Sequence, residues 1–308
     1  MNERELQILI EKHITISNFP KVYKRLGKLE KEQIKKSLLG YAERLKWIDG
    51  RANLPVKVFH RIRKSNDCLD EMLKEARFSA KGVNSNFRVK LPQVMNEDLA
   101  YFLGVIAGDG YISKPKPNQR GGWVIQMCED DYVFQTKIYI PLVKRLFGSK
   151  PKLYINKRKD GRRNYYSNLH SFIVVIYLTK ILKIRNGRKV DKVQIPKAII
   201  KHKNIRLRLA FIRGLFDTDG TVTSGRVRFS TISKKLASQV RCVLGENEIG
   251  HSENIWLKNS SSKILYTIEI RKKSLKRFNK LIGFKNNRKK KRLDRILAPS
   301  SSGQEVTS

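Results

Sequence analysis

Apolar residues follow a helical spacing in the first part of the chain. Ile34, Leu38 and Leu45 are separated by four or seven residues, which places them on one face of a helix, and similar spacing continues downstream. The pattern predicts an all-helical region over residues 1–78. Residues 79–95 begin with a run rich in Gly, Ser and Asn and predict a linker.

Beyond the linker, helical and alternating patterns follow one another twice in the same order. The first series predicts a helix ending at Asp109, strands at 123–127 and 152–156 around a helix at 132–147, and extended residues at 165–177. The second predicts a helix ending at Asp219, a strand at 226–231, a helix from Ser233 to about Glu248, strands at 255–258 and 264–270, and a final helix from Ser274. We therefore predict an α+β fold with two pseudo-symmetric repeats, 96–200 (with the inter-repeat linker) and 201–296, and a disordered tail at 297–308.

A nine-residue motif opens both series, at residues 102–110 and 212–220. Each copy has small residues four positions apart, Gly104 and Gly108 in the first copy and Gly214 and Thr218 in the second. Small residues at that spacing leave a helix face without bulk, so the two helices could pack backbone to backbone.

Each motif ends in an aspartate followed by glycine, at Asp109 and Asp219. An acid at the carboxyl end of a helix opposes the helix dipole, and two close carboxylates repel unless they share a proton or a cation. A bound cation would offset both costs. The alternative is that each Asp-Gly pair only forms a turn after its helix. A simple turn is a reasonable explanation for one copy of the motif, but a weaker one for two copies of the same pattern.

The charge of the chain points to a polyanionic partner. The sequence has 66 Lys and Arg against 27 Asp and Glu, a net charge of +39, and nucleic acid is the usual counterpart of such a charge. A membrane is not expected, because no apolar run reaches the roughly 18–20 residues of a spanning helix. The cysteines and histidines show no zinc-like spacing, so metal chemistry would use carboxylates and a hard ion such as Mg²⁺.

Basic residues are placed where a sheet could meet DNA. In the strand at 226–231, Val227 and Phe229 alternate with Arg226 and Arg228, so one face is apolar and the other basic. Residues 157–163 hold five basic residues around a predicted hairpin turn, which suits a ribbon in the major groove. The basic run at 288–292, including Lys289, could contact phosphate or form a solvated run, and we expect it to be solvated.

At the two motifs the chain resembles the single-chain LAGLIDADG homing endonucleases. The family motif has glycine at its third and last positions, a small residue seventh and an acid eighth, which Gly104, Gly108, Asp109 and Gly110 match in the first copy and Gly214, Thr218, Asp219 and Gly220 in the second. The resemblance implies a saddle of two β-sheets on double-stranded DNA, Mg²⁺ or Mn²⁺ held by the eighth-position acids, hydrolysis that breaks both strands, and a monomer. The sixth position is Asp217 in the second copy but Ala107 in the first, so Asp217 is expected to be structural.

The family also places auxiliary polar residues around its site, and several positions are candidates here. The auxiliary candidates are Gln126, Arg228, Lys234, Arg271 and Lys272, with Met127 as an alternative to Gln126. The backbones of Gly108 and Thr218 are further candidate metal ligands. The DNA-binding candidates are Lys152, Lys157, Arg158, Lys159, Arg162, Arg163, Arg226, Arg228 and Lys258.

Two other functions stay open on the same scaffold: an RNA maturase bound to intron RNA, and a DNA-binding regulator without cleavage. An intein is not expected, because the chain starts at Met1 without a splicing Cys or Ser and ends without His-Asn. Residues 1–78 could be an additional DNA-binding module, with Lys57, Arg61, Arg63 and Lys64 on a recognition helix, or a packing appendage. We expect an intracellular protein.

Overall fold

A computed structural model describes residues 3–38, 40–63, 73–80, 88–115, 122–158, 160–187, 191–223, 225–257 and 263–298. The chain folds into two compact units. The first contains residues 1–99, 111–127 and 140–187, and the second contains residues 100–110, 128–139 and 188–308. The second unit therefore includes most of the helix that carries the first motif. The repeat boundaries proposed from the sequence stay a prediction.

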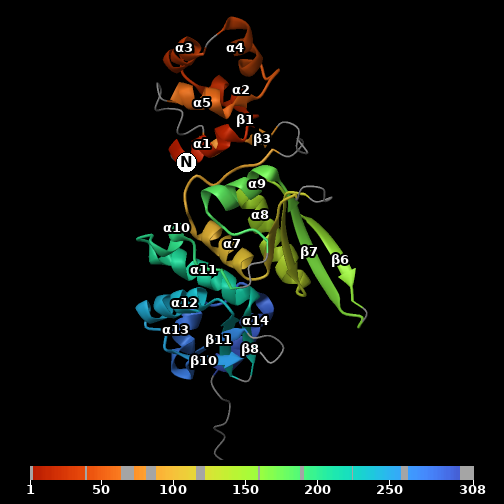
Figure 1. Cartoon of the computed structure of the whole chain (residues 1–308), viewed down its shortest axis with the longest axis vertical. Coiled ribbons are helices and arrows are strands. Elements are labelled where there is room, and N and C mark those ends of the chain that lie inside the picture. Colours follow the sequence, from red (N-terminus) through yellow and green to blue (C-terminus); the bar gives the residue numbers. More distant parts are fainter. Residues whose placement is uncertain are drawn as a thin grey trace, which may run out of the picture. The chain divides into compact units, whose positions relative to one another are not determined.

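The N-terminal region combines helices with a small sheet (Figure 1). Its helices are α1 (Glu3–Glu11), α2 (Phe19–Arg25), α3 (Lys28–Ser37), α4 (Tyr41–Ile48) and α5 (Val56–Arg63), and its antiparallel sheet has the order β2 (Leu54–Pro55), β1 (Ile14–Ile16), β3 (Phe78–Ala80). The prediction of an all-helical region was wrong, because this region also contains a three-stranded sheet. The strands are too short to produce a clear alternating pattern. β3 extends into the predicted linker, and Val89 of that linker pairs with Phe78.

The first repeat contains a four-stranded antiparallel sheet in the order β4-β5-β7-β6. The strands are β4 (Gly110–Ser113), β5 (Val124–Glu129), β6 (Lys152–Lys157) and β7 (Arg163–His170); the helices are α7 (Glu97–Ala107), η1 (Phe134–Tyr139), α8 (Ile140–Phe147), α9 (Phe172–Ile176) and η2 (Tyr177–Ile181). The strands β5 and β6 and the helix over 132–147 confirm the prediction. Residues 172–177 are helical rather than extended, because the Ser171 side chain caps the helix by accepting from the Val174 amide at 3.2 Å.

The second repeat has the matching sheet order β10-β11-β9-β8. Its strands are β8 (Gly220–Thr223), β9 (Arg226–Thr231), β10 (His251–Leu257) and β11 (Ile264–Ile270), and its helices are α10 (Lys197–Ile200), α11 (Ile205–Thr218), α12 (Lys234–Glu246), η3 (Lys272–Ser274), α13 (Leu275–Leu281) and α14 (Asn287–Leu297). In both repeats a motif helix leads directly into a short strand, β4 or β8, that the sequence pattern did not predict. The fold is α+β with antiparallel sheets, as predicted.

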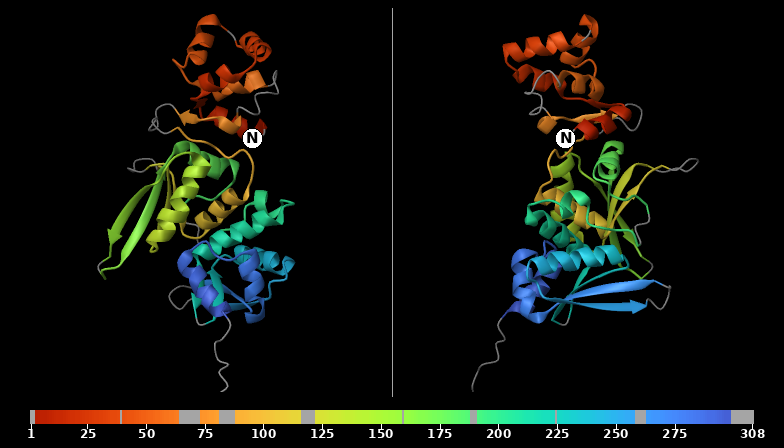
Figure 2. Two further views of the ribbon diagram at one scale, coloured as in Figure 1. Left: turned by 180° about the vertical axis from the view of Figure 1, so that it is seen from behind. Right: turned by 60° about the vertical axis from the view of Figure 1, so that its left-hand side comes forward.

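The predicted final helix from Ser274 is in fact two helices, α13 and α14. Gly283 adopts a φ of +56°, which ends α13, and the Asn286 side chain then caps α14 by accepting from the amides of Arg288 and Lys289 at 3.1 and 3.2 Å. This break sets the direction of α14, whose first turn reaches the motif helix α11. In Figure 2 the β10–β11 hairpin extends beyond the helices of its own repeat.

Candidate functional site

The helices α7 and α11 touch through their glycines. A side-chain carbon added at Gly104 would lie 2.0 Å from the carbonyl oxygen of Phe211, and one added at Gly214 would lie 2.3 Å from that of Tyr101. Carbon atoms of side chains do not approach backbone oxygens so closely, so glycine is required at both positions. The predicted backbone-to-backbone packing of the motif helices is confirmed.

The same contact brings the ends of the two motifs together. A side-chain carbon at Gly108 would lie 2.0 Å from the hydroxyl oxygen of Thr218 and 3.3 Å from a carboxylate oxygen of Asp219. Asp109 follows Gly108 directly, so the two motif acids lie at neighbouring helix ends. Both are exposed. The structure thus places two exposed aspartates at the neighbouring ends of the two motif helices.

Asp217, two residues before Asp219, is buried and held by the protein. It accepts a hydrogen bond from the Tyr101 hydroxyl at 2.6 Å, from the Asn286 amide at 3.0 Å and from the Lys285 amide at 3.1 Å. Burial raises the pKa of Asp217, while these hydrogen bonds act in the opposite direction. Its carboxylate ties α7 to α11 and to the segment before α14, which agrees with the expected structural role.

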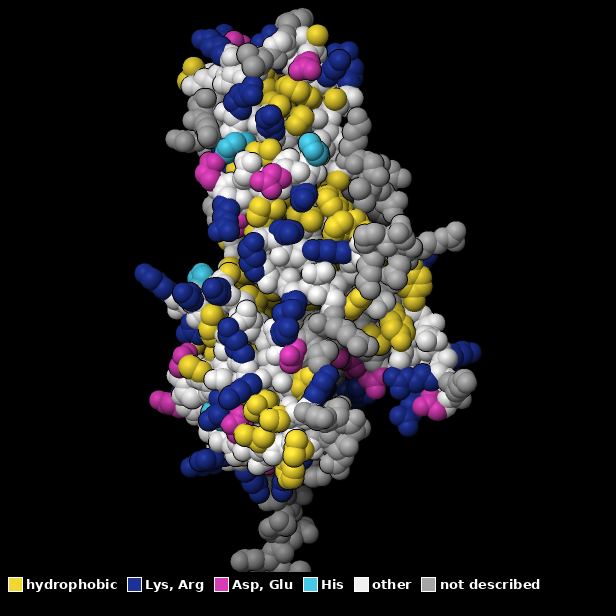
Figure 3. All heavy atoms as spheres, in the orientation of Figure 1, with side chains coloured by type: hydrophobic (Ala, Val, Ile, Leu, Met, Phe, Trp, Pro, Cys, Tyr) yellow, Lys and Arg dark blue, Asp and Glu magenta, His cyan; other side chains and the backbone are white. Residues whose placement is uncertain are grey.

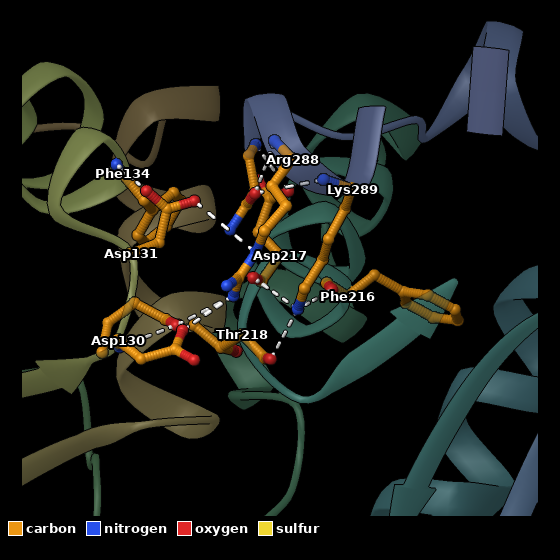
Figure 4. A network of polar contacts seen from close by, with 10 residues as sticks. Asp130, Asp131, Phe134, Phe216, Asp217, Thr218, Arg288 and Lys289 are labelled. Carbon is orange, nitrogen blue, oxygen red and sulfur yellow. Dashed lines mark hydrogen bonds and ion pairs between the residues drawn. The ribbon is translucent and has the colours of Figure 1, made fainter. Parts of the chain in front are cut away.

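Lys289 is buried, which corrects the expectation that residues 288–292 form a solvated run. Its side chain is on the inner face of α14 together with Leu293, one helical turn away. Its ammonium donates to the carbonyl oxygens of Thr218, Asp217 and Phe216 at 2.7, 2.8 and 3.1 Å (Figure 4). These are the last carbonyls of α11, where the helix dipole is negative. The i, i+4 spacing with Leu293 was the sequence signal for this position.

A second cation on α14 contacts three acids at and after the end of β5. Arg288 donates to Asp130 at 2.7 Å and lies 3.8 Å from Glu129 and 3.9 Å from Asp131 (Figure 4). Burial, a hydrogen bond with Asp130 and the charge of Asp109 raise the pKa of Glu129 to about 8, against the effect of Lys289. The sequence pattern did not point to Glu129, since an acid at a strand end has no distinctive signal.

The oxygen atoms at the motif ends suit a hard divalent ion. Asp109 and Asp219 supply two exposed carboxylates, and the charges of Asp109 and Glu129 interact. Within the described ranges, no three His, Cys, Asp or Glu residues are grouped to hold a metal. Mg²⁺ commonly binds through one or two carboxylates and keeps waters or substrate phosphates as its other ligands. The two motif acids fit that mode, and the Thr218 carbonyl already accepts from Lys289.

The auxiliary candidates occupy different environments. On the open face of β5, Gln126 donates to the Asn168 side chain at 3.0 Å, whereas Met127 is fully buried and cannot meet a ligand. Arg228 is paired with Glu269 at 2.5 Å on the open face of β9. The remaining three, Lys234, Arg271 and Lys272, are exposed at the start of α12 and around η3.

Most of the candidate DNA-binding residues are exposed. In the first unit, Lys152, Lys157, Arg158, Arg162 and Arg163 are exposed on the β6–β7 hairpin. In the second unit, Val227 and Phe229 face the core, and Arg226 and Arg228 face outward, as predicted. Lys159 and Lys258 lie outside the described residues, as does the tail from residue 299. On the face shown in Figure 3, Lys and Arg side chains are widespread and acidic ones sparse.

A comparison with protein families finds a match within the second repeat. Residues 206–283, which run from α11 to just past the end of α13, match the family model of the LAGLIDADG-like domain. The chain carries a LAGLIDADG-like domain. The resemblance seen in its motifs is therefore confirmed for this part of the chain, which includes Asp217 and Asp219.

Several known proteins are similar to this chain. Among curated proteins, the replication factor C small subunit of Methanocaldococcus jannaschii is 31% identical over 68% of the chain, and a DNA polymerase of Thermococcus sp. is 31% identical over 46%. The chain spans 11% and 8% of those two proteins. Among solved structures, variants of the homing endonuclease I-DmoI match 61% of the chain and 95% of their own at 23% identity and a TM-score of 0.45.

The activities named for these two curated relatives are not assigned to this chain. Each match covers a small fraction of the relative, and the two relatives have different activities in their names. In the described part of the chain, no helix is long and apolar enough to cross a membrane.

Proposed function

We propose that the protein is a site-specific DNA endonuclease that breaks both strands of a long recognition site in a divalent-metal-dependent reaction. The observation that carries this proposal is the pair of exposed carboxylates, Asp109 and Asp219, at the ends of two helices that pack through glycine. The glycine contact brings together the ends of two helices that are about a hundred residues apart in the chain. The net charge of +39 supplies the attraction for a polyanionic substrate.

Within this proposal Asp109 and Asp219 hold Mg²⁺ or Mn²⁺. The bound ion supplies a Lewis acid and an activated water for phosphodiester hydrolysis. The chain's own residues do the rest: the glycine contact fixes the separation of the two acids, and the outward-facing residues of the sheets hold the DNA. Gln126 and Arg228, on the open faces of β5 and β9, are available to orient the DNA or a water molecule.

The proposal is tested on DNA selected by the protein itself. Duplexes bound in Ca²⁺ are recovered from a randomised pool, and Mg²⁺ is then added to the wild type, Asp109→Asn and Asp219→Asn. We expect the wild type to break both strands, and each variant to bind within about threefold but to make no double-strand break, because one ligand charge is lost without a change of shape.

Three outcomes would contradict the proposal. Full cleavage by either variant would overturn the assignment of the site. A wild type that binds duplex DNA without cutting it in Mg²⁺ or Mn²⁺ would favour the non-cleaving regulator. Preference for structured RNA over duplex DNA in the same selection would favour the maturase.

A further inference from the structure

The first turn of α14 places a buried positive charge next to the two motif acids. Lys289 is 8% exposed, and its nitrogen lies within hydrogen-bond distance of three carbonyl oxygens. Three acceptors require three N–H donors, which an ammonium has and a neutral amine lacks. The geometry therefore describes a charged Lys289.

This charge acts on the acids around it. The carboxylates of Glu129, Asp217, Asp109 and Asp219 all stabilise the ammonium, against the burial that lowers the pKa of Lys289. The attraction is mutual: the ammonium lowers the pKa of Glu129 and of Asp217, against the burial that raises the pKa of both. The cation that the end of α11 requires is thus provided by the chain itself.

The ammonium of Lys289 lies at the end of α11. Arg288, the residue before it, pairs with Glu129 and Asp130 at the end of β5. A divalent ion that approaches Asp219 meets the repulsion of a cation already hydrogen-bonded to the preceding carbonyl of Thr218. The negative charge of a DNA phosphate would offset that repulsion.

We propose that Lys289 is an internal counter-ion of the motif acids, a positioning residue that keeps divalent ions weakly bound until DNA is present. Two effects follow. Without DNA, Lys289 holds the acid pair together in place of a metal. With DNA, the negative charge of the phosphate offsets the repulsion between Lys289 and the divalent ion, so metal and substrate bind together. Only the cleavage readout rests on the proposed nuclease function, because metal binding can be measured without it.

The test compares three variants of the full chain. Lys289→Met removes the charge and keeps the length of the side chain, Lys289→Arg keeps the charge, and Lys290→Met removes a charge from the neighbouring, exposed residue. Folding is checked by circular dichroism and thermal unfolding in EDTA. Ca²⁺ binding is then measured by calorimetry without DNA.

We expect Lys289→Met to bind Ca²⁺ about tenfold more tightly than the wild type, because one nearby positive charge is gone. Lys289→Arg and Lys290→Met should stay within about twofold. In the cleavage assay, Lys289→Met should need less Mg²⁺ for half-maximal rate but reach a lower maximal rate, with unchanged DNA affinity. A residue that only capped α11 would loosen the site and weaken metal binding, which is the opposite sign.

Unchanged or weaker Ca²⁺ binding by folded Lys289→Met would overturn the proposal. If that variant does not fold, Lys289→Gln, which still donates hydrogen bonds without a charge, takes its place. Failure of both neutral variants to fold would show a structural cap and would also reject the proposal. If Lys289→Met binds Ca²⁺ more tightly but the wild type cuts no DNA, the counter-ion proposal stands and only the proposed nuclease function is rejected.

Discussion

Two aspartates of the second motif, two residues apart, have opposite environments. Asp217 is fully buried and accepts hydrogen bonds from Tyr101, Lys285 and Asn286, while Asp219 is exposed at the helix end. A ligand can approach Asp219 from solvent, but it would have to break a buried network to reach Asp217. Burial therefore separates the structural acid from the candidate catalytic one, a distinction that the residue type alone does not make.

The raised pKa of Glu129 predicts a specific pH dependence of stability. Its pKa is about 8 in the folded chain and about 4.3 in an unfolded one, so the folded state holds the proton more tightly. Its stabilising contribution is complete below about pH 4.3 and is lost as the pH rises to about 8. Glu129→Gln should therefore raise the unfolding temperature at pH 9 and leave it nearly unchanged at pH 4.

This prediction is checked by thermal unfolding in EDTA across that pH range. The difference in unfolding temperature between Glu129→Gln and the wild type should grow between about pH 4 and pH 8. Because Glu253 lies apart from this cluster and pairs with Arg241 at 2.6 Å, Glu253→Gln serves as the control. A constant difference across the range for Glu129→Gln would show that Glu129 is not the group that titrates.

Arg228 is the residue on β9 most suited to read a base, and Glu269 fixes its orientation at 2.5 Å. We expect Arg228→Ala to weaken binding by about 1–3 kcal/mol and to relax preference at one or two base pairs. Glu269→Gln should instead strengthen binding to all sequences, because it removes a negative charge from the same face. Binding to single-base variants of the selected site measures both, and an unchanged preference profile for Arg228→Ala would exclude base reading.

At the scale of elements, the contact of α7 with α11 depends on the absence of two side chains. Gly104→Ala or Gly214→Ala should lower the free energy of unfolding by about 1–3 kcal/mol or more, because each methyl group would overlap a backbone oxygen. Gly245→Ala is a matched control: this helical, exposed glycine of α12 has free space around it, and the change should stabilise by up to about 1 kcal/mol. Chemical denaturation measures all three. Equal effects at the three sites would contradict the close helix contact.

Elements with a strong local signal were predicted well, and elements defined by distant contacts were not. The cap at Ser233 and the buried Val240 and Val243 mark α12 in the sequence. The strands β4 and β8 are four residues long and depend on pairing with β5 and β9, so their own residues carry little signal. Lys289 is an intermediate case: its spacing of four from Leu293 puts it on the buried face of α14, but the basic residues around it hid that signal.

At the scale of the whole molecule, the positive charge is concentrated after the N-terminal region. Residues 1–80 hold 18 basic and 11 acidic residues, a net charge of +7, and residues 81–308 hold the other 48 and 16, a net charge of +32. A polyanion is attracted mainly by the second of these segments. The exposed cations of α2 and α3, such as Lys21, Lys24 and Lys28, therefore have a smaller expected share in DNA binding than those of the two repeats.

The salt dependence of DNA binding tests this distribution. The logarithm of the binding constant should fall with the logarithm of salt concentration by roughly 0.9 for each phosphate neutralised. Replacing Lys152, Lys157 and Arg158 together by Gln should reduce the slope by roughly two to three, because all three are exposed on the β6–β7 hairpin. The same change at Lys21, Lys24 and Lys28 should reduce the slope by less. A wild-type slope that corresponds to fewer than about three phosphate contacts would contradict a DNA interface formed by the sheets of the two repeats. So would an equal decrease of the slope in both triple variants.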